Sequence, residues 1–278
     1  MNHRSILIVC LAMLGLAVDG WGQGWDKIAF VSNRDGLPNI WIMNADGSDP
    51  VNLTKGRGIC LYPAWSPDGM TIAYINGDGH GKDEIWLMDA DGSNPQQVTD
   101  DAVHKAGLAW SEDGSRIYYD TLPTGHPKDG TESFVIGLED GSGALPVDAE
   151  EGAIARMWPR SPDGTKSMVV LREGDQTDIY VVDNSGDERT STRLTDSPNV
   201  DISPAWSPDG MRIVFASGPS MGGPMDIWVV DIDGSNLVNL TNGLGGGWPA
   251  WRPASPAATS VEAQSWGQIK SLLSIGTH

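Results

Sequence analysis

Residues 204–241 constrain the fold of this chain more than any other stretch, because shortened or altered copies of them make up most of the sequence. Four β-prone runs, PAW, RIVFAS, DIWVV and LVNLT, are separated by segments rich in turn-forming residues. A unit of four short antiparallel strands cannot bury both of its faces alone, so it must pack against neighbouring copies. The sequence therefore predicts an all-β fold made of stacked four-stranded units.

The tryptophan of the PAW run sets the period of the repeat. It recurs at intervals of 45, 50, 46 and 45 residues if the arginine of RSPDG is counted in the same position, which gives Trp65, Trp110, Arg160, Trp206 and Trp251. Periods of this size with four strands each are typical of β-propeller blades. A tryptophan at one fixed position of each innermost strand is expected to wedge between blades. The repeat predicts whole blades at residues 62–99, 108–147, 157–195 and 204–241.

The two ends of the repeat region complete one another. Residues 27–54 supply three strands with no PAW run before them, and residues 247–252 supply a PAW run with no strands after it. Joined, they make a fifth blade, and a closed ring removes exposed sheet edges. We therefore expect a five-bladed β-propeller of four-stranded antiparallel blades. Its ring is closed by pairing of the C-terminal strand with the N-terminal blade.

The repeat motif carries a family resemblance. The run [PA]-W-S-P-D-G-x-x-I-x-[FY], followed by D-I-W-x-x-D-x-D-G-S-N and N-L-T, resembles the WD40-like repeat of the TolB β-propeller family. The resemblance covers residues 27–252 and implies a TolB-like propeller of the cell envelope. This chain is expected to lack the α/β domain that precedes the propeller in that family, and to have five blades where the family has six. Because propellers carry many functions, the resemblance is more specific for fold than for activity.

The segments outside the repeats predict an exported protein. Residues 1–22 have the layout of a secretory signal peptide, with a basic start, an apolar run over 6–18 and cleavage expected after Gly22. That run is too short to cross a bilayer, so we expect no membrane-spanning segment. Residues 253–278 are expected to form a linker and a short C-terminal helix. The predicted location is the periplasm or the outside of the cell.

Charge and cysteine content narrow the range of partners. The net charge of −19 argues against nucleic acid and anionic lipid, because like charges repel. Only Cys60 remains after the expected cleavage point, so no internal disulfide is expected and stability must come from packing. We expect a monomer that binds a protein, a peptide or another polymer of the cell envelope.

Three motifs suggest chemistry but are better explained by structure. The DxDGS runs at 89–93 and 231–235 resemble calcium loops, but their glycine stands at position four rather than six, which favours hairpin turns. The GxSxG match at 218–222 is flanked by predicted strands, unlike a nucleophile elbow. Loop histidines at positions 80, 104 and 126 could approach one another, but without a recognised ligand spacing. We predict no cofactor, no metal and no catalytic residue.

A carbohydrate-active propeller enzyme, either a metal-dependent lyase or a glycosidase, is the alternative function. A glycosidase needs two carboxyl groups that face one pocket. Among the residues that lead into the innermost strands, Asp201 alone is acidic. The sequence therefore favours a non-catalytic binding protein over this alternative.

The predicted binding surface is the face where two kinds of loop meet. Loops between second and third strands, and loops that lead into innermost strands, open on the same face and hold the least repeat-like residues. Loops on a rigid scaffold commonly carry function, and mixed charge with aromatic residues suits a peptide or protein segment. The predicted partner-binding residues are Arg34, Arg57, Tyr62, His104, Lys105, Arg156, Asp201 and Trp248.

Overall fold

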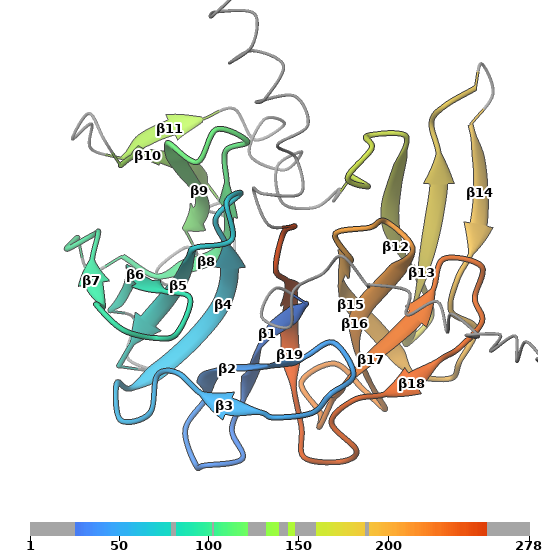
Figure 1. Ribbon diagram of the computed structural model, residues 1–278, viewed down its shortest axis with the longest axis horizontal. Coiled ribbons are helices and arrows are strands. Elements are labelled where there is room, and N and C mark those ends of the chain that lie inside the picture. Colours follow the sequence, from blue (N-terminus) through green and yellow to red (C-terminus); the bar gives the residue numbers. More distant parts are fainter. Residues whose placement is uncertain are drawn as a thin grey trace, which may run out of the picture.

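The computed structural model describes residues 26–78, 82–101, 103–121, 132–138, 144–147, 160–186 and 189–254. All regular structure in this part of the chain is β-strand, so it holds no helix able to cross a membrane. The strands form three four-stranded sheets and one seven-stranded sheet, which stand next to one another (Figure 1). The predicted all-β class is confirmed. The expected signal peptide and C-terminal helix lie outside the described residues.

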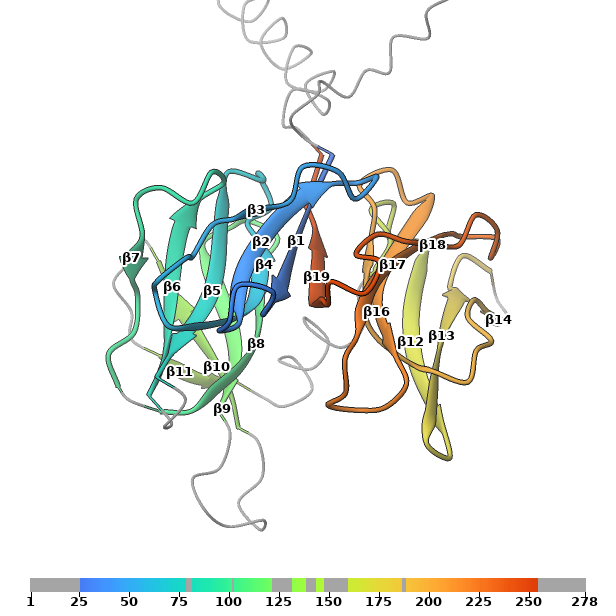
Figure 2. The ribbon, with the colours of Figure 1, turned by 90° about the horizontal axis from the view of Figure 1, so that it is seen from below.

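The first sheet joins the two ends of the repeat region. Its order is β19-β1-β2-β3, and its strands are β1 (Lys27–Ser32), β2 (Asn39–Asn44), β3 (Val51–Asn52) and β19 (Gly247–Trp251). β19 runs antiparallel to β1, with Ile28 opposite Trp251 and Ala29 opposite Ala250. Both views place the last strand beside the first (Figures 1 and 2). The terminal strands therefore pair as the PAW run near the end of the chain predicted.

The second and third sheets each follow the chain in order. The second contains β4 (Ile59–Trp65), β5 (Thr71–Gly77), β6 (Asp83–Asp89) and β7 (Gln96–Gln97). The third contains β8 (Lys105–Trp110), β9 (Arg116–Thr121), β10 (Glu132–Gly137) and β11 (Leu145–Val147). Their strands are joined by turns such as SPDG, in which Gly69 takes a φ of 66° and Asp68 accepts a 2.9 Å hydrogen bond from the Met70 amide. The predicted four-stranded units are present in both places.

The seven-stranded sheet differs from the two separate blades that were predicted at 157–195 and 204–241. It contains β12 (Lys166–Glu173), β13 (Gln176–Asp183), β14 (Thr190–Arg193), β15 (Val200–Trp206), β16 (Arg212–Gly218), β17 (Asp226–Asp231) and β18 (Val238–Asn239). A single parallel pair, Thr177 with Val200, links β13 to β15. In the described residues, the innermost strand expected before β12 is represented by one bridge, between Arg160 and Ser167. On either side of this one-pair link, the strands β12, β13 and β14 and the strands β15 to β18 each pair in chain order, as in separate blades.

The repeated tryptophans connect neighbouring sheets. The indole N–H of Trp65 donates a 3.2 Å hydrogen bond to the Ala250 carbonyl of the first sheet. Trp110 repeats this contact one sheet further on, with a 3.1 Å bond to the Ala64 carbonyl. Trp65 is buried in a cluster with residues of the first two sheets, which include Ile40. The expected wedge between units is therefore confirmed at Trp65 and Trp110.

Glycines of the DGS turns allow a second contact between sheets. Gly92, in the turn after β6, lies against Leu53 of the first sheet, and Gly47, in the turn after β2, lies against Leu240 of the seven-stranded sheet. A Cβ atom on Gly47 would come within 2.8 Å of the Leu240 carbonyl oxygen, and its φ of 85° also favours glycine. In both cases the turn of one sheet packs tightly against the end of the outermost strand of another sheet. The turn of the first sheet packs in this way on the seven-stranded sheet, which holds the last part of the repeat region.

Replacement of Trp65 by phenylalanine tests the wedge. Trp65→Phe keeps an aromatic ring between the sheets but removes the donor to the Ala250 carbonyl, so we expect a loss of about 1–2 kcal/mol in the free energy of unfolding. Urea denaturation measures this loss. The matched control is Trp248→Phe, which alters a tryptophan that is 38% exposed. An equal effect of the two changes would contradict a special role for the wedge.

Candidate functional site

Each innermost strand in the described part of the chain has a β-bulge three residues before its tryptophan. The pairing register shifts at this point in β4, β8, β15 and β19. The residues there have left-handed backbone, with φ of 54° at Tyr62, 58° at Gly107, 53° at Ser203 and 46° at Trp248. Tyrosine, serine and tryptophan rarely adopt this conformation, and such strain concentrates at functional sites. The four equivalent positions therefore mark a candidate site where the innermost strands lie together.

Two of the predicted binding residues meet at these bulges. The rings of Tyr62 and Trp248, from β4 and β19, have centroids 5.0 Å apart and planes inclined by 59°. Burial raises the pKa of the Tyr62 hydroxyl above its ordinary value, and the negative charge of Asp83 adds to the rise. Trp248 is partly exposed at 38%. The pair therefore presents an aromatic surface with one end accessible, an arrangement suited to contact with a partner.

A pocket of about 580 Å³ opens beside Trp248, between the first sheet and the seven-stranded sheet. Its walls come from the end of β1, from the loop 221–225 between β16 and β17, and from the segment 245–248 that leads into β19. Met221, in the lining, is 63% exposed, and Leu37 and Leu244, which directly precede the lining residues Pro38 and Gly245, are 55% and 58% exposed. Grouped exposed apolar side chains around a pocket are typical of binding sites. We name the pocket together with Leu37, Met221, Leu244 and Trp248 the pocket face.

Arg34 fixes the loops of the pocket face. Its Nε donates a 3.0 Å hydrogen bond to the Ser32 hydroxyl, and its Nη2 donates a 3.3 Å bond to the Gly245 carbonyl. The guanidinium also lies 4.7 Å from the centroid of the Trp41 ring. Burial lowers the pKa of Arg34, and the charges of Asp35 and Asp226 oppose this shift. Arg34 thus joins the β1–β2 loop to the segment before β19 and shapes the pocket.

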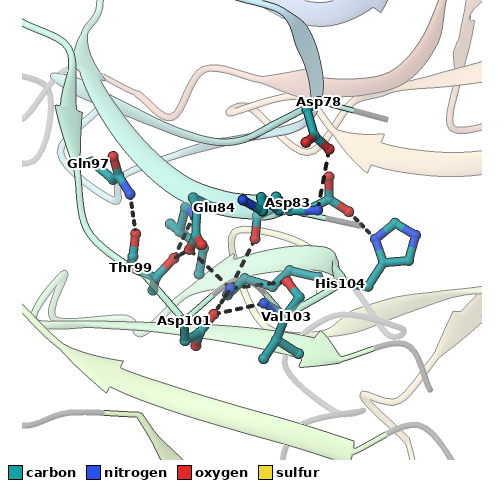
Figure 3. A network of polar contacts seen from close by, with 11 residues as sticks. Asp78, Asp83, Glu84, Gln97, Thr99, Asp101, Val103 and His104 are labelled. Atoms are coloured by element: carbon teal, nitrogen blue, oxygen red, sulfur yellow. Dashed lines mark hydrogen bonds and ion pairs between the residues drawn. The ribbon is translucent and has the colours of Figure 1, made fainter. Parts of the chain in front are cut away.

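Lys105 has a different environment from the one that the sequence analysis assumed. Only 2% of the residue is exposed, and its ammonium donates to the backbone carbonyls of Asp83 at 2.9 Å and Val103 at 3.2 Å. It also contacts the carboxylates of Glu84, at 3.2 Å, and Asp101. Figure 3 shows Glu84, Asp101 and Val103 around this centre. Because the ammonium is enclosed by internal acceptors, Lys105 links β8 to β6 and is not accessible to a partner.

The other predicted residues lie apart from the pocket face. His104 is half-buried, and its Nδ1 contacts the Asp83 carboxylate (Figure 3). The Arg57 guanidinium reaches the second sheet, where it donates a 3.1 Å hydrogen bond to the Gly92 carbonyl. Arg156 lies outside the described residues. Of the predicted residues, Trp248 lines the pocket, Tyr62 contacts Trp248, and Arg34 contacts the lining residues Ser32 and Gly245.

Asp201 lines a second pocket, of about 330 Å³, where the parts of the seven-stranded sheet meet. Only 1% of the residue is exposed. Burial raises the pKa of its carboxyl, the hydroxyls of Ser217, Thr195 and Ser197 oppose the rise, and the charge of Asp178 adds to it. Of the three hydroxyls, that of Ser197 donates within hydrogen-bond distance, to Oδ2 at 3.4 Å. No described donor reaches Oδ1.

Comparison with known proteins identifies the family. The family model described as the TolB beta propeller domain matches residues 20–121 and 80–258, which together cover most of the chain. The chain belongs to the TolB β-propeller family. The resemblance that the repeat motif indicated is therefore confirmed.

Individual relatives of this TolB-family chain are moderately similar. It is 31% identical over 191 residues to the protein TolB homolog of Chlorobium chlorochromatii, covering 69% of this chain and 31% of that protein. It is 32% identical over 210 residues to the Tol-Pal system protein TolB of Bordetella pertussis, covering 76% and 36% respectively. The chain spans about a third of the length of these relatives.

A solved structure supports the fold. The hydrazine synthase of Kuenenia stuttgartiensis matches with a TM-score of 0.54 over 84% of this chain and 47% of that one. The sequence identity is 12%, so this likeness concerns the architecture alone. The family model is that of a β-propeller domain, which agrees with the four-stranded antiparallel sheets of the described structure.

The described residues of this TolB-family chain contain no group of three or more histidine, cysteine, aspartate or glutamate side chains placed to hold a metal ion. His104 contacts Asp83, as described above. The other two histidines considered for a metal site, His80 and His126, lie outside the described residues. The DxDGS turns hold internal contacts: Asp91 Oδ1, for example, accepts hydrogen bonds from the Ser93 amide at 2.9 Å and the Ser93 hydroxyl at 2.6 Å. These turns therefore close hairpins, as expected.

Sequence reasoning missed the apolar members of the pocket face. Leu37, Met221 and Leu244 are single apolar residues in Gly- and Pro-rich loops, where the repeat offers no template for comparison. A usable signal was that large apolar residues are uncommon in exposed turn segments. Met221 also lies inside the GxSxG match, which attracts attention to Ser220 instead. A search for apolar residues in loops would have found all three.

Proposed function

We propose that this protein is an exported, non-catalytic β-propeller that binds a protein or peptide of the cell envelope through its pocket face. The observation that carries the proposal is the pocket beside Trp248, which has the exposed Met221 in its lining and the exposed Leu37 and Leu244 directly next to lining residues in the sequence. A pocket of about 580 Å³ falls within the usual range of ligand sites. Apolar and aromatic side chains at the centre of a surface dominate binding energy in protein interfaces.

The proposal includes a closed ring of five blades over residues 27–252, preceded by a cleaved signal peptide at 1–22 and active as a periplasmic or secreted monomer. Pairing of β19 with β1 and packing of Gly47 on Leu240 support the ring, because both join the first sheet to the last part of the chain. Contacts also run from β15 to β19, from β19 to β4 and from β4 to β8, which are the innermost strands. The relationship to Tol-Pal system proteins supports a protein partner in the envelope.

Two substitutions on the pocket face test the proposed function. Met221→Asp places a charge on the apolar rim, and Trp248→Gly removes the exposed ring while relieving the left-handed backbone strain, as Gly107 does in β8. A protein captured from an envelope fraction by the wild-type propeller is purified, and its affinity is measured by calorimetry. We expect both changes to weaken binding by about tenfold or more, since one removes an aromatic contact and the other places a charge among the apolar contacts of the site.

The matched control is Met211→Asp. Met211 is 60% exposed but lies in the turn between β15 and β16, at the opposite end of the sheet from the β16–β17 loop. This change introduces the same charge and should leave binding unchanged. If Met211→Asp weakens binding as much as Met221→Asp does, or if neither pocket-face change has an effect, the pocket face is not the binding site.

A further inference from the structure

A threonine makes the same contact at equivalent positions of the second sheet and the seven-stranded sheet. Thr99 accepts a 2.9 Å hydrogen bond from the Ile85 amide and donates a 2.6 Å bond to Glu84. In the seven-stranded sheet, Thr195 accepts a 3.0 Å bond from the Ile179 amide and lies 3.5 Å from the Asp178 carboxylate. Six residues after each threonine, the innermost strand buries one polar side chain, which is Lys105 after Thr99 and Asp201 after Thr195.

The charge at this equivalent position is reversed between the two sheets. Lys105 brings an ammonium to Glu84 and Asp101. At the corresponding place, Asp201 brings a carboxylate towards Asp178 and Ser197. The Arg193 guanidinium is already shared between Asp178, at 2.7 Å, and Asp196, at 2.9 Å. The local group therefore holds three carboxylates and one guanidinium, and no ion pair between described residues involves Asp201.

The Asp201 carboxylate is poorly satisfied for a buried group. Its Oδ1 accepts no hydrogen bond from the described residues, and its Oδ2 has one long contact of 3.4 Å with the Ser197 hydroxyl. A buried acceptor without a partner costs free energy, and such groups are rare in folded proteins. A cation that enters from outside would supply the charge that Lys105 provides in the other sheet.

The shape and lining of the second pocket indicate which cation fits. Leu194, Phe215, Trp228 and Val230 form apolar walls, and the polar lining consists of Asp201, Ser217, Thr195, Asp196, Ser197 and Asn199, of which Asp196 already pairs with Arg193. Apolar walls suit an alkyl chain, and one free carboxylate oxygen suits the compact ammonium of lysine better than the planar, bidentate guanidinium of arginine. We infer that this pocket accepts a lysine side chain from a partner protein, with its ammonium placed against Asp201.

This inference deepens the proposed function, on which it rests for the existence of a partner protein. It concerns a different pocket from the one beside Trp248, and the two share no lining residue. A small-molecule probe can therefore test the lysine pocket even if no partner binds the pocket face. Failure of the proposed function and failure of the lysine pocket can therefore be told apart.

The probe is n-butylammonium chloride, which reproduces the lysine side chain. Thermal denaturation of the full-length protein is followed with rising probe concentration, and sodium chloride and 1-butanol serve as matched salt and apolar controls. We expect a saturable rise in the melting temperature with butylammonium that neither control reproduces, because a ligand that binds the folded state stabilises it. An equal rise with sodium chloride or 1-butanol would overturn the inference.

Two pairs of variants test whether butylammonium binds in the pocket beside Asp201. Asp201→Asn should weaken butylammonium binding by about tenfold or more, since it removes the buried charge, whereas Asp175→Asn alters a fully exposed carboxylate and should not. Leu237 lines the pocket and is 54% exposed, so Leu237→Trp should obstruct binding of the probe. Val238 is 48% exposed and does not line the pocket, so Val238→Trp should leave binding unchanged. The second pair remains informative if Asp201→Asn fails to fold. Unchanged binding in Leu237→Trp would then overturn the inference.

Discussion

A chain that ends at Gly245 is expected to lose most of its folding stability. It lacks β19, so β1 keeps β2 but loses its other antiparallel partner and exposes the backbone groups of Ile28 and Ala29 along a new edge. Trp251, only 6% exposed, is removed from a core cluster that includes Phe30. Loss of one buried tryptophan side chain alone costs about 3–5 kcal/mol. Since domains are stable by about 5–15 kcal/mol, little stability should remain.

Thermal and urea denaturation, followed by circular dichroism, measure this effect. The matched control ends at Ser255, which leaves every strand of the described structure in place. We expect the control to melt close to the full-length chain, and the shorter chain to melt far lower or to be unfolded when isolated. Trp251→Ala provides an intermediate case, because it keeps the β19 backbone and removes the ring. If the chain that ends at Gly245 melts with the control, β19 does not complete the fold.

The strand order could be predicted because the repeat reports it directly. A PAW run with no later strands and a set of three strands with no PAW run leave one way to build a complete unit, and β19 pairs with β1 accordingly. The link between β13 and β15 could not be predicted in this way. It consists of the single pair Thr177 and Val200, which depends on how two units approach in space and leaves no pattern in either strand.

The candidate site was predictable to a smaller extent. Tyr62 and Trp248 precede the prolines of two PAW runs, so the repeat places them at equivalent positions, and the structure brings their rings together. Lys105 was misread because charged residues usually face solvent. Its burial depends on acceptors from other segments, Glu84 and Asp101, whose convergence is a tertiary feature. The same limitation applies to Asp201, for which sequence alone does not reveal a buried oxygen without a donor.

Replacement of Lys105 by methionine should destabilise the protein by about 3–5 kcal/mol, because it removes one partner from a buried charged network. Methionine fills a similar volume, so the loss reports mainly the missing ammonium. Glu84 would keep its 2.6 Å bond from Thr99 but lose its buried cation, and the carbonyls of Asp83 and Val103 would lose a donor. Urea denaturation of Lys105→Met measures the change in the free energy of unfolding.

Two further variants separate this network from a general effect of lost charge. Lys55→Met removes an exposed ammonium and should change the free energy of unfolding by less than about 0.5 kcal/mol. Glu84→Gln combined with Lys105→Met should recover part of the loss, because the second change removes the carboxylate that the first leaves without its cation. If Lys105→Met is as mild as Lys55→Met, the ammonium does not hold β8 against β6. The comparison of Lys105 with Asp201 would then lose its basis, since it treats the lysine network as the complete form of the site.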